Sequence, residues 1–303
     1  MRWISLLLLA LLGVMPTLGR RQAVPVLAAG KEEDTVRTVF VTVAETNGTP
    51  VSGLKREDFS LRANGAFQEI VETLPAGAMP IVVGILIDES GSMSVGNDRK
   101  EKLQTLSPFL SSVISKPDEA IIVGVSDDER HVTSFTNNIQ ELQQGVKAIS
   151  DAEVHGSTLL YDSLLSLVQN MQQEQDRRRI IVVFGDFRDT MGDHKLKEII
   201  SHLQEMETSV FVLLDDLHWP HDLKGQKLGI EVGETGGAAY KIDSVHDMER
   251  ALKQIQIAVR SSYLLKYRMR GRLKESAELN VTVQGKDVNV LAPQRSPSGI
   301  PSH

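Results

Sequence analysis

The chain has 303 residues and carries 33 Lys and Arg against 40 Asp and Glu, which gives a formal net charge of -7 at pH 7. This charge provides no basic surface for wrapping nucleic acid or binding anionic lipid, so neither is expected as a partner. The chain has no cysteine, which excludes disulfides, thiolate metal ligands, a cysteine nucleophile and lipid attachment through cysteine. Its length allows one domain of roughly 200 residues with smaller modules beside it.

The N-terminus predicts export. Arg2 precedes an apolar run of 12 residues, Ile4 to Met15, which fits a signal peptide and falls short of the ~20 residues of a membrane-spanning helix. We expect a signal peptide over residues 1–19, with cleavage after Gly19 or as late as Gly30. Without cleavage the same segment would remain as a membrane anchor. The expected location is therefore periplasmic or secreted, with no membrane span after cleavage.

Residues 31–77 predict a small antiparallel β module. Thr35 to Val43 alternates apolar and polar residues, and the segments Phe59 to Ala63 and Phe67 to Leu74 flank a turn at Asn64-Gly65. Alternation with period two is typical of half-buried strands, and an Asn-Gly pair between two such segments favours a hairpin.

Residues 79–259 predict an α/β domain with a doubly wound, mostly parallel, Rossmann-like sheet. Short apolar runs alternate here with amphipathic helical stretches, the pattern of βαβ units with helices on both faces. A short strand over Val132 to Phe135 is expected at an antiparallel edge. The expected parallel strands are Ile81 to Ile87, Ala120 to Val125, Ile180 to Phe184, Ser209 to Leu214 and Ala238 to Ile242. The expected helices are Arg99 to Ser115, Ile139 to Ile149, Leu159 to Gln173, Leu196 to Met206, Lys224 to Glu234 and Val245 to Val259.

Residues 260–291 return to strand alternation, over Tyr263 to Arg270, Ala277 to Gln284 and Val288 to Leu291. Residues 292–303 are rich in Pro and Ser, and we expect them to be disordered. Because each flank is too short for a β core of its own, we expect the N- and C-terminal strands to pair into one small β domain. The α/β domain would then be an insertion in it.

Oxygen-bearing side chains follow the first strand of the α/β domain. Asp88, Ser90 and Ser92 alternate with Glu89 and Gly91, and in open α/β sheets ligands bind beyond the carboxyl ends of the strands. Carboxylates and hydroxyls are hard ligands that suit Mg²⁺. Two further segments reach the same edge and could add oxygens: residues 156–158, before a helix, and residues 185–189, after a strand.

The order of these segments resembles the metal-ion-dependent adhesion site of the von Willebrand factor type A domain. An apolar strand runs into Asp-x-Ser-x-Ser, a threonine stands shortly before Leu-Tyr-Asp, and a later strand runs into aspartate. The resemblance covers Met79 to Val259. It implies one Mg²⁺ or Mn²⁺, and a partner protein bound through a carboxylate at the metal. The implied ligands are Asp88, Ser90, Ser92, Thr158 and Asp186.

Two features qualify this resemblance. The family usually has glycine after the third-loop aspartate, where Phe187 stands here, so we expect that loop to differ. The flanking strands are similar to those around the type A domain in a group of exported bacterial proteins, which bears on location more than on partner.

Two alternatives to an adhesion module remain open: a metal-assisted hydrolase or phosphatase, and an envelope assembly factor with a structural metal site. The Asp-x-Asp of aspartyl phosphatases is absent at Asp88 to Ser90, and the chain has no Gly-x-Ser-x-Gly elbow. We therefore expect a binding module and not an enzyme. The identity of the partner and the oligomeric state do not follow from the sequence.

Overall fold

The computed structural model describes residues 35–94, 98–172, 177–192, 194–215, 223–269, 277–285 and 287–296, with the backbone alone at Ala78 and at residues 223–226. The predicted signal peptide and residues 297–303 lie outside this range. Across the described residues, no helix has both the length and the apolar character needed to cross a membrane. The described chain forms two six-stranded sheets.

The first sheet is mixed, and every neighbouring pair in it is parallel except β5 with β6. Its strand order is β6-β5-β4-β7-β8-β9, which confirms the predicted doubly wound α/β fold. The apolar runs of the two central strands are buried, as their composition predicts. The strands are β4 Ile81–Asp88, β5 Glu119–Val125, β6 Glu129–His131, β7 Arg178–Gly185, β8 Thr208–Leu214 and β9 Ala238–Lys241.

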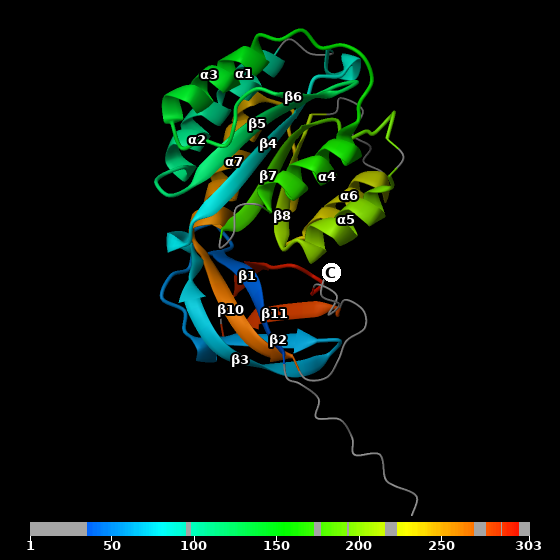
Figure 1. Cartoon of the computed structure of the whole chain (residues 1–303). Helices are drawn as coiled ribbons and strands as arrows, with labels where there is room; N and C mark the ends of the chain where they lie inside the picture. The colour runs from blue at the N-terminus through cyan, green and yellow to red at the C-terminus, as the bar shows by residue number, and fades with distance from the viewer. Residues whose placement is uncertain are drawn as a thin grey trace, which may run out of the picture. The chain divides into compact units, whose positions relative to one another are not determined.

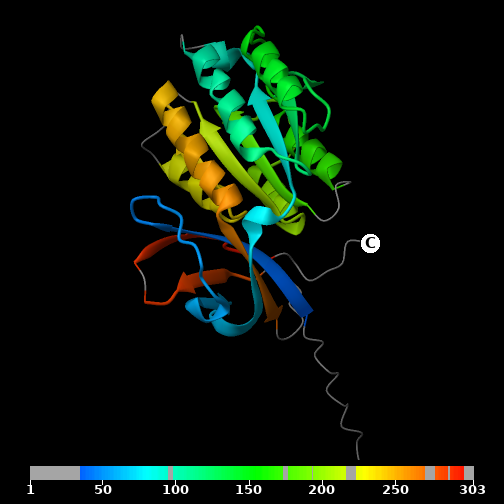
Figure 2. The same ribbon diagram turned by 90° about the vertical axis from the view of Figure 1, so that its left-hand side faces the viewer.

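Helices cover both faces of this sheet (Figures 1 and 2). Alternate residues of β4 point to opposite faces, so Ile85 packs with α1, α2, α3 and α7, whereas Leu86 packs with α4, α5 and α6. One face has α1 Arg99–Gln104, α2 Leu106–Val113, α3 Ile139–Ser150 and α7 Val245–Arg260. The other has α4 Leu160–Met171, α5 Leu196–Glu205 and α6 Leu223–Gly233.

Two predicted elements of this domain are wrong in detail. The edge strand is Glu129–His131 and not Val132 to Phe135, because a short edge strand does not need the apolar residues by which the prediction placed it. The single helix expected from Arg99 is divided at Thr105 into α1 and α2. Pro108 has no N–H for the carbonyl of residue 104, so it cannot continue an uninterrupted helix across that turn.

The second sheet is antiparallel, with strand order β11-β2-β3-β10-β1-β12, and it confirms that N- and C-terminal strands share one small β domain. Strand β10 lies between β1 and β3. Asn64 and Gly65 both have positive φ, 47° and 79°, as the predicted tight hairpin turn requires. The strands are β1 Thr35–Glu45, β2 Phe59–Ala63, β3 Ala66–Pro75, β10 Ser262–Met269, β11 Leu279–Val283 and β12 Val288–Leu291.

The chain passes into the α/β domain from β3 and returns from it into β10, and these two strands are neighbours in the antiparallel sheet. Strand β3 leads through the short 3-10 turn η2 (Ala76–Ala78) into β4, and α7 is followed after Ser261 by β10. The chain stays ordered beyond the predicted start of the tail, since Ser296 is fully buried and its N–H donates to the Ala277 carbonyl at 2.8 Å.

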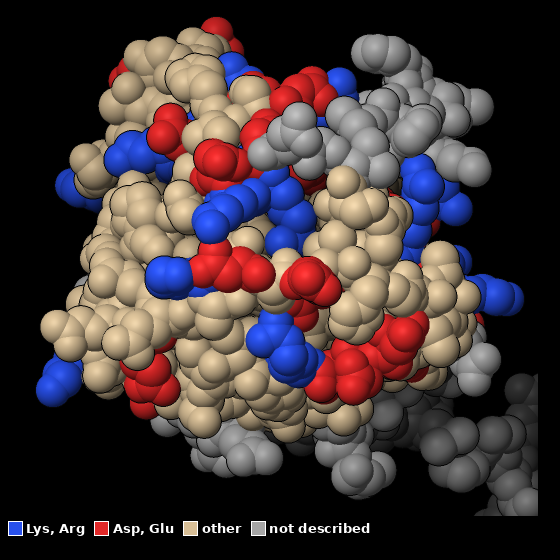
Figure 3. Space-filling view, turned by 90° about the horizontal axis from the view of Figure 1, so that it is seen from above, with Lys and Arg blue, Asp and Glu red and all other residues tan. Residues whose placement is uncertain are grey.

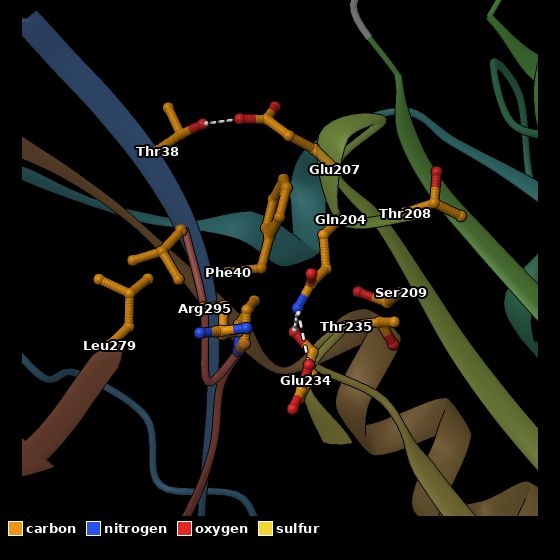
Figure 4. Close-up of a pocket in the computed structure, with 12 residues that line it drawn as sticks. Thr38, Phe40, Gln204, Glu207, Thr208, Ser209, Glu234, Thr235, Leu279 and Arg295 are labelled. Carbon is orange, nitrogen blue, oxygen red and sulfur yellow. Dashed lines mark hydrogen bonds between the residues drawn. The ribbon is translucent and has the colours of Figure 1, made fainter. Parts of the chain in front are cut away.

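A small cavity lies between β1 and the ends of α5 and α6, away from the carboxyl edge of the parallel sheet (Figure 4). Its volume is about 30 Å³, which is room for one or two water molecules. Thr38 donates to Glu207 at 3.2 Å, and Gln204 donates to the Glu234 carbonyl at 3.1 Å. These bonds make the cavity part of the packing and not a ligand pocket.

Candidate functional site

The first loop of the candidate site follows β4 at the carboxyl edge of the sheet. The Ser90 N–H donates to Asp88 Oδ1 at 2.8 Å, and the hydroxyls of Ser90 and Ser92 lie 3.0 Å apart. Asp88 and Ser90 are buried, whereas Ser92 is exposed. The loop thus gathers one carboxylate and two hydroxyls.

The second loop lies before α4 and contains Thr158, which is buried. Two backbone hydrogen bonds join it to the first loop: the N–H of Gly91 donates to the Gly156 carbonyl at 3.1 Å, and that of His155 to the Glu89 carbonyl at 2.8 Å. Residues 156–158 therefore lie beside the first loop, at the carboxyl edge of the sheet, as the sequence predicts.

The third loop follows β7. Asp186 is buried and accepts a hydrogen bond from the N–H of Arg188 at 3.0 Å. Thr190 joins this loop to the second one, because its hydroxyl accepts from the Thr158 N–H at 2.9 Å and its own N–H donates to the Thr158 carbonyl at 3.0 Å. A Cβ at Gly185 would lie 2.5 Å from the Cβ of Asp88, so glycine lets the third loop approach the first.

Phe187 occupies a left-handed conformation, with φ of 56°. Glycine adopts this conformation without strain, so the glycine expected at this position would fit the same backbone. The ring is 7% exposed, packs in the apolar cluster around α4, and lies 6.0 Å from the ring of Tyr161.

Asp88 Oδ2 is buried and has no hydrogen-bond partner among the described residues. Burial raises the pKa of Asp88 to about 6; the hydrogen bonds from Ser90 lower it, and the nearby Asp186 carboxylate raises it further. A buried carboxylate oxygen without a partner is costly, and a divalent cation is the kind of group that would satisfy it.

The donor set fits a hard cation. Two carboxylates and three hydroxyls, from Asp88, Asp186, Ser90, Ser92 and Thr158, are oxygen ligands of the type that Mg²⁺ and Mn²⁺ accept. Within the described ranges, no three His, Cys, Asp or Glu side chains are grouped to hold a metal. A cation here would therefore depend on the hydroxyls as much as on the carboxylates.

Charged side chains that the sequence analysis did not single out surround this set. The carboxylate of Glu89, 5% exposed, pairs with the guanidinium of Arg130, with Nε to Oε2 at 3.2 Å. Lys102, 3% exposed, pairs with Asp98 at 3.1 Å and with Asp215 at 2.9 Å. A charged residue within a helical pattern usually indicates a solvated face, so no sequence signal marked Lys102.

Arg99 also contacts the first loop. Its Nη2 donates to the Asp88 carbonyl at 3.3 Å, and its Nε is buried without a hydrogen-bond partner in the described part of the chain. Burial lowers the pKa of Arg99, while the carboxylates of Glu89, Asp88 and Asp215 raise it. Seen from above, looking onto the carboxyl edge of the sheet, basic and acidic side chains are interspersed on this face (Figure 3).

Comparison with known proteins identifies relatives of this fold. A family model described as von Willebrand factor type A domain matches residues 83–188, the segment that holds all five predicted ligands. No curated protein matches the chain in a sequence search.

Solved structures match over more of the chain. A von Willebrand factor type A protein from Catenulispora acidiphila is 10% identical, with a TM-score of 0.52, over 88% of this chain and 74% of that one. The manganese-loaded TRAP protein of Plasmodium vivax is 11% identical, with a TM-score of 0.47, over 76% of this chain and 84% of that one. The PilB minor pilin of Streptococcus sanguinis is 15% identical, with a TM-score of 0.46, over 60% of this chain; the match spans 62% of the pilin.

Proposed function

Because the chain carries a von Willebrand factor type A domain, we propose that its carboxyl-edge loops hold one Mg²⁺ or Mn²⁺ and capture a carboxylate of a partner protein there. The proposed ligands are Asp88, Ser90, Ser92, Thr158 and Asp186. When bound, the cation supplies the positive charge that attracts the partner's carboxylate. The five side chains would hold the cation, and the exposed Ser92 would lie on the side from which a partner approaches.

The observation that carries this proposal is Asp88 Oδ2, which is buried without a partner at the end of a fully buried strand. The exposure of Ser92 supports it as well, because a partner must reach the site from that side. The hydrogen bonds through Gly156 and Thr190 hold the three loops in one arrangement, so the site does not need to assemble when the cation binds.

We propose binding without catalysis. His155 belongs to the second loop and its side chain is exposed; among the described residues no side-chain hydrogen bond or ion pair holds it in the fixed position that a general base needs. Location outside the cytoplasm, with cleavage of the N-terminal segment, belongs to the same proposal and rests on the pattern of residues 1–30.

Titration calorimetry of the purified protein with Mg²⁺ and with Mn²⁺ tests the site. We expect one weak binding event, because few protein ligands replace the water that the cation loses. Ser90→Ala and Thr158→Ala should abolish this heat and keep the circular dichroism spectrum. Ser111→Ala, on the exposed side of α2, is the matched control. Undiminished binding in both Ser90→Ala and Thr158→Ala would refute the ligand assignment.

Partner capture is tested by pull-down from envelope extract with and without a chelator, using the wild type and Asp88→Ala. The proposal expects proteins that are retained only by the wild type with a free divalent cation. Hydrolysis of generic phosphate, ester or peptide substrates that disappears in Asp88→Ala would favour the enzyme instead.

A further inference from the structure

Glu89 stands between two proposed ligands, Asp88 and Ser90, and carries a buried carboxylate that the proposed metal site does not use. Both of its oxygens pair with the guanidinium of Arg130: Oε2 accepts from Nε at 3.2 Å, and Oε1 accepts from Nη2. A buried ion pair adds little net stability, because its charges lose their contact with water. A pair with two parallel hydrogen bonds does, however, fix the orientation of the two side chains.

The edge strand β6 brings Arg130 to this carboxylate (Figure 1). Arg130 lies directly opposite Gly124 of β5 in the antiparallel pair, and residues in such positions share one face of the sheet. Gly124 has no side chain, and a Cβ there would collide with Glu89 Oε2. The carboxylate of Glu89 therefore occupies the space that this glycine leaves, within reach of the guanidinium.

The backbone of Glu89 is held as well as its side chain. Its N–H donates to the carbonyl of Val125, at the end of β5, at 2.7 Å, and its carbonyl accepts from the N–H of His155, in the second loop, at 2.8 Å. Glu89 is thus joined to β5, to β6 and to the second loop. A movement of this residue would displace Asp88 and Ser90 on either side of it.

Two effects of Arg130 on a bound cation have opposite signs. As a positive charge near the site, Arg130 repels Mg²⁺, so its removal would strengthen binding. As the partner that fixes Glu89, it keeps the first loop in place, so its removal would weaken binding. The sign of the change in affinity therefore distinguishes the two effects.

We propose that Glu89 is a positioning residue of the metal site, and that its pair with Arg130 holds the first loop so that Asp88 and Ser90 present their oxygens to the cation. This inference rests on the proposed function. Glu89 acts through the ligands beside it and does not touch the cation. The polar strand β6 then has a role in the site, because it supplies the arginine.

Calorimetry with Mg²⁺ on the full chain tests this role with three variants and a control. Arg130→Gln removes the charge and the planar fork. Glu89→Asp keeps the negative charge but is one methylene too short to make both hydrogen bonds. The double variant Glu89→Gln/Arg130→Gln leaves no unpaired buried charge, so it should fold even if a single variant does not. The control is Arg250→Gln, which removes an exposed arginine paired with Asp247 on α7.

Arg130→Gln, Glu89→Asp and the double variant should each bind Mg²⁺ about tenfold more weakly than the wild type, as is usual when a group that orients a metal ligand is lost. The double variant should be no weaker than the single ones, because all three lose the same interaction. In chelator, amide hydrogen exchange of residues 88–92 should be faster in Arg130→Gln than in the wild type. Arg250→Gln should match the wild type in both measurements.

Unchanged or tighter Mg²⁺ binding by Arg130→Gln would overturn this inference and leave the proposed function intact. Unchanged exchange of residues 88–92 in that variant would also overturn it, because the first loop would then keep its position without the pair. If the wild type itself binds neither Mg²⁺ nor Mn²⁺, the proposed function fails and this inference with it.

Discussion

Asp88 stands where a buried strand ends, and its environment links metal affinity to pH. Burial raises the pKa of this carboxyl above its ordinary value of 3.8 to about 6. In the metal-free protein it is therefore mostly charged above pH 6 and mostly protonated below. A divalent cation needs the carboxylate and must displace the proton.

We expect the apparent affinity for Mg²⁺ to be constant above about pH 7 and to fall by about tenfold per pH unit below about pH 6, because one proton is displaced. Calorimetry between pH 5 and 8 measures this. Thr158→Ser should show weaker binding with the same break near pH 6. An affinity independent of pH over this range would contradict the role given to Asp88.

Two opposing contributions to the free energy of unfolding meet at Phe187: a strained backbone and a buried ring. Its left-handed φ costs a non-glycine residue about 1 kcal/mol, whereas its buried ring stabilises the fold by about 3 kcal/mol relative to alanine. Phe187→Ala loses the ring and keeps the strain. Phe187→Gly loses the ring and removes the strain.

Both variants should therefore be less stable than the wild type, and Phe187→Gly should be the more stable of the two by about 1 kcal/mol. Urea denaturation measures both differences. A Phe187→Ala protein at least as stable as Phe187→Gly would show that the backbone at this position relaxes out of the left-handed region.

At the scale of elements, two successive arginines at the start of β7 donate hydrogen bonds to the C-terminal ends of helices on opposite faces of the sheet. Arg178 Nη1 donates to the carbonyls of Ala258 and Val259, in the last turn of α7, at 3.1 and 3.2 Å. Arg179 donates to the carbonyls of Met171 at 3.4 Å and Met206 at 3.1 Å, at the ends of α4 and α5. Neighbouring residues in a strand point to opposite faces of the sheet. The pair Arg178-Arg179 therefore donates hydrogen bonds to helix ends on both faces.

Arg178→Met should destabilise the protein by about 3 kcal/mol, since it removes the arginine donor from the buried Val259 carbonyl and from the Ala258 carbonyl, which keeps only the Thr42 hydroxyl. Arg179→Met should cost only about 1 kcal/mol, because Arg179 is half-buried and water can replace it. Thermal unfolding of the two variants measures the difference. Equal losses would mean that burial does not decide the importance of these contacts.

The sequence predicted the elements whose signal is local. Strands β4, β7 and β8 each contain an apolar run, and the Asn64-Gly65 turn needs two positive φ angles that these residues supply. It missed the division of the first helix, although Pro108 carried the signal. It also missed β6, which consists of polar residues.

In the candidate site, too, only the residues with a local sequence signal were predicted. The five predicted ligands lie at the carboxyl edge because strand ends are readable in the sequence. Arg99, Lys102 and Glu89 are charged residues whose burial depends on contacts with distant segments, such as the pairs Lys102 with Asp215 and Glu89 with Arg130. No pattern within one helix or loop indicates such pairs.

At the scale of the whole molecule, Arg178 also joins the two sheets. Besides its bonds to α7, it donates to the Ser262 hydroxyl at 2.6 Å, and its guanidinium lies 4.5 Å from the centre of the Phe40 ring. It therefore contacts the end of α7, the first residue of β10 and the middle of β1. A change in the position of α7 would reach the antiparallel sheet directly.

Deletion of Thr35 to Leu74 should cause aggregation, because it removes β1 and β3, the two strands that flank β10, and uncovers Leu265 and Tyr267, which are fully buried. The segment Met79 to Val259 should remain soluble and bind Mg²⁺. Size-exclusion chromatography and calorimetry measure these outcomes. A soluble, monomeric deletion variant would show that β10 does not depend on its neighbours.

The insertion of the α/β domain between β3 and β10 also decides how the molecule responds to tension. Residues 35 and 296, near the two ends of the described chain, both belong to the β domain, where β1 pairs with β10 and with β12. A pull on the two ends would therefore first load the hydrogen bonds between these strands. The candidate site lies outside this load path, so a stretched chain would keep the arrangement of its three loops until the antiparallel sheet itself gave way.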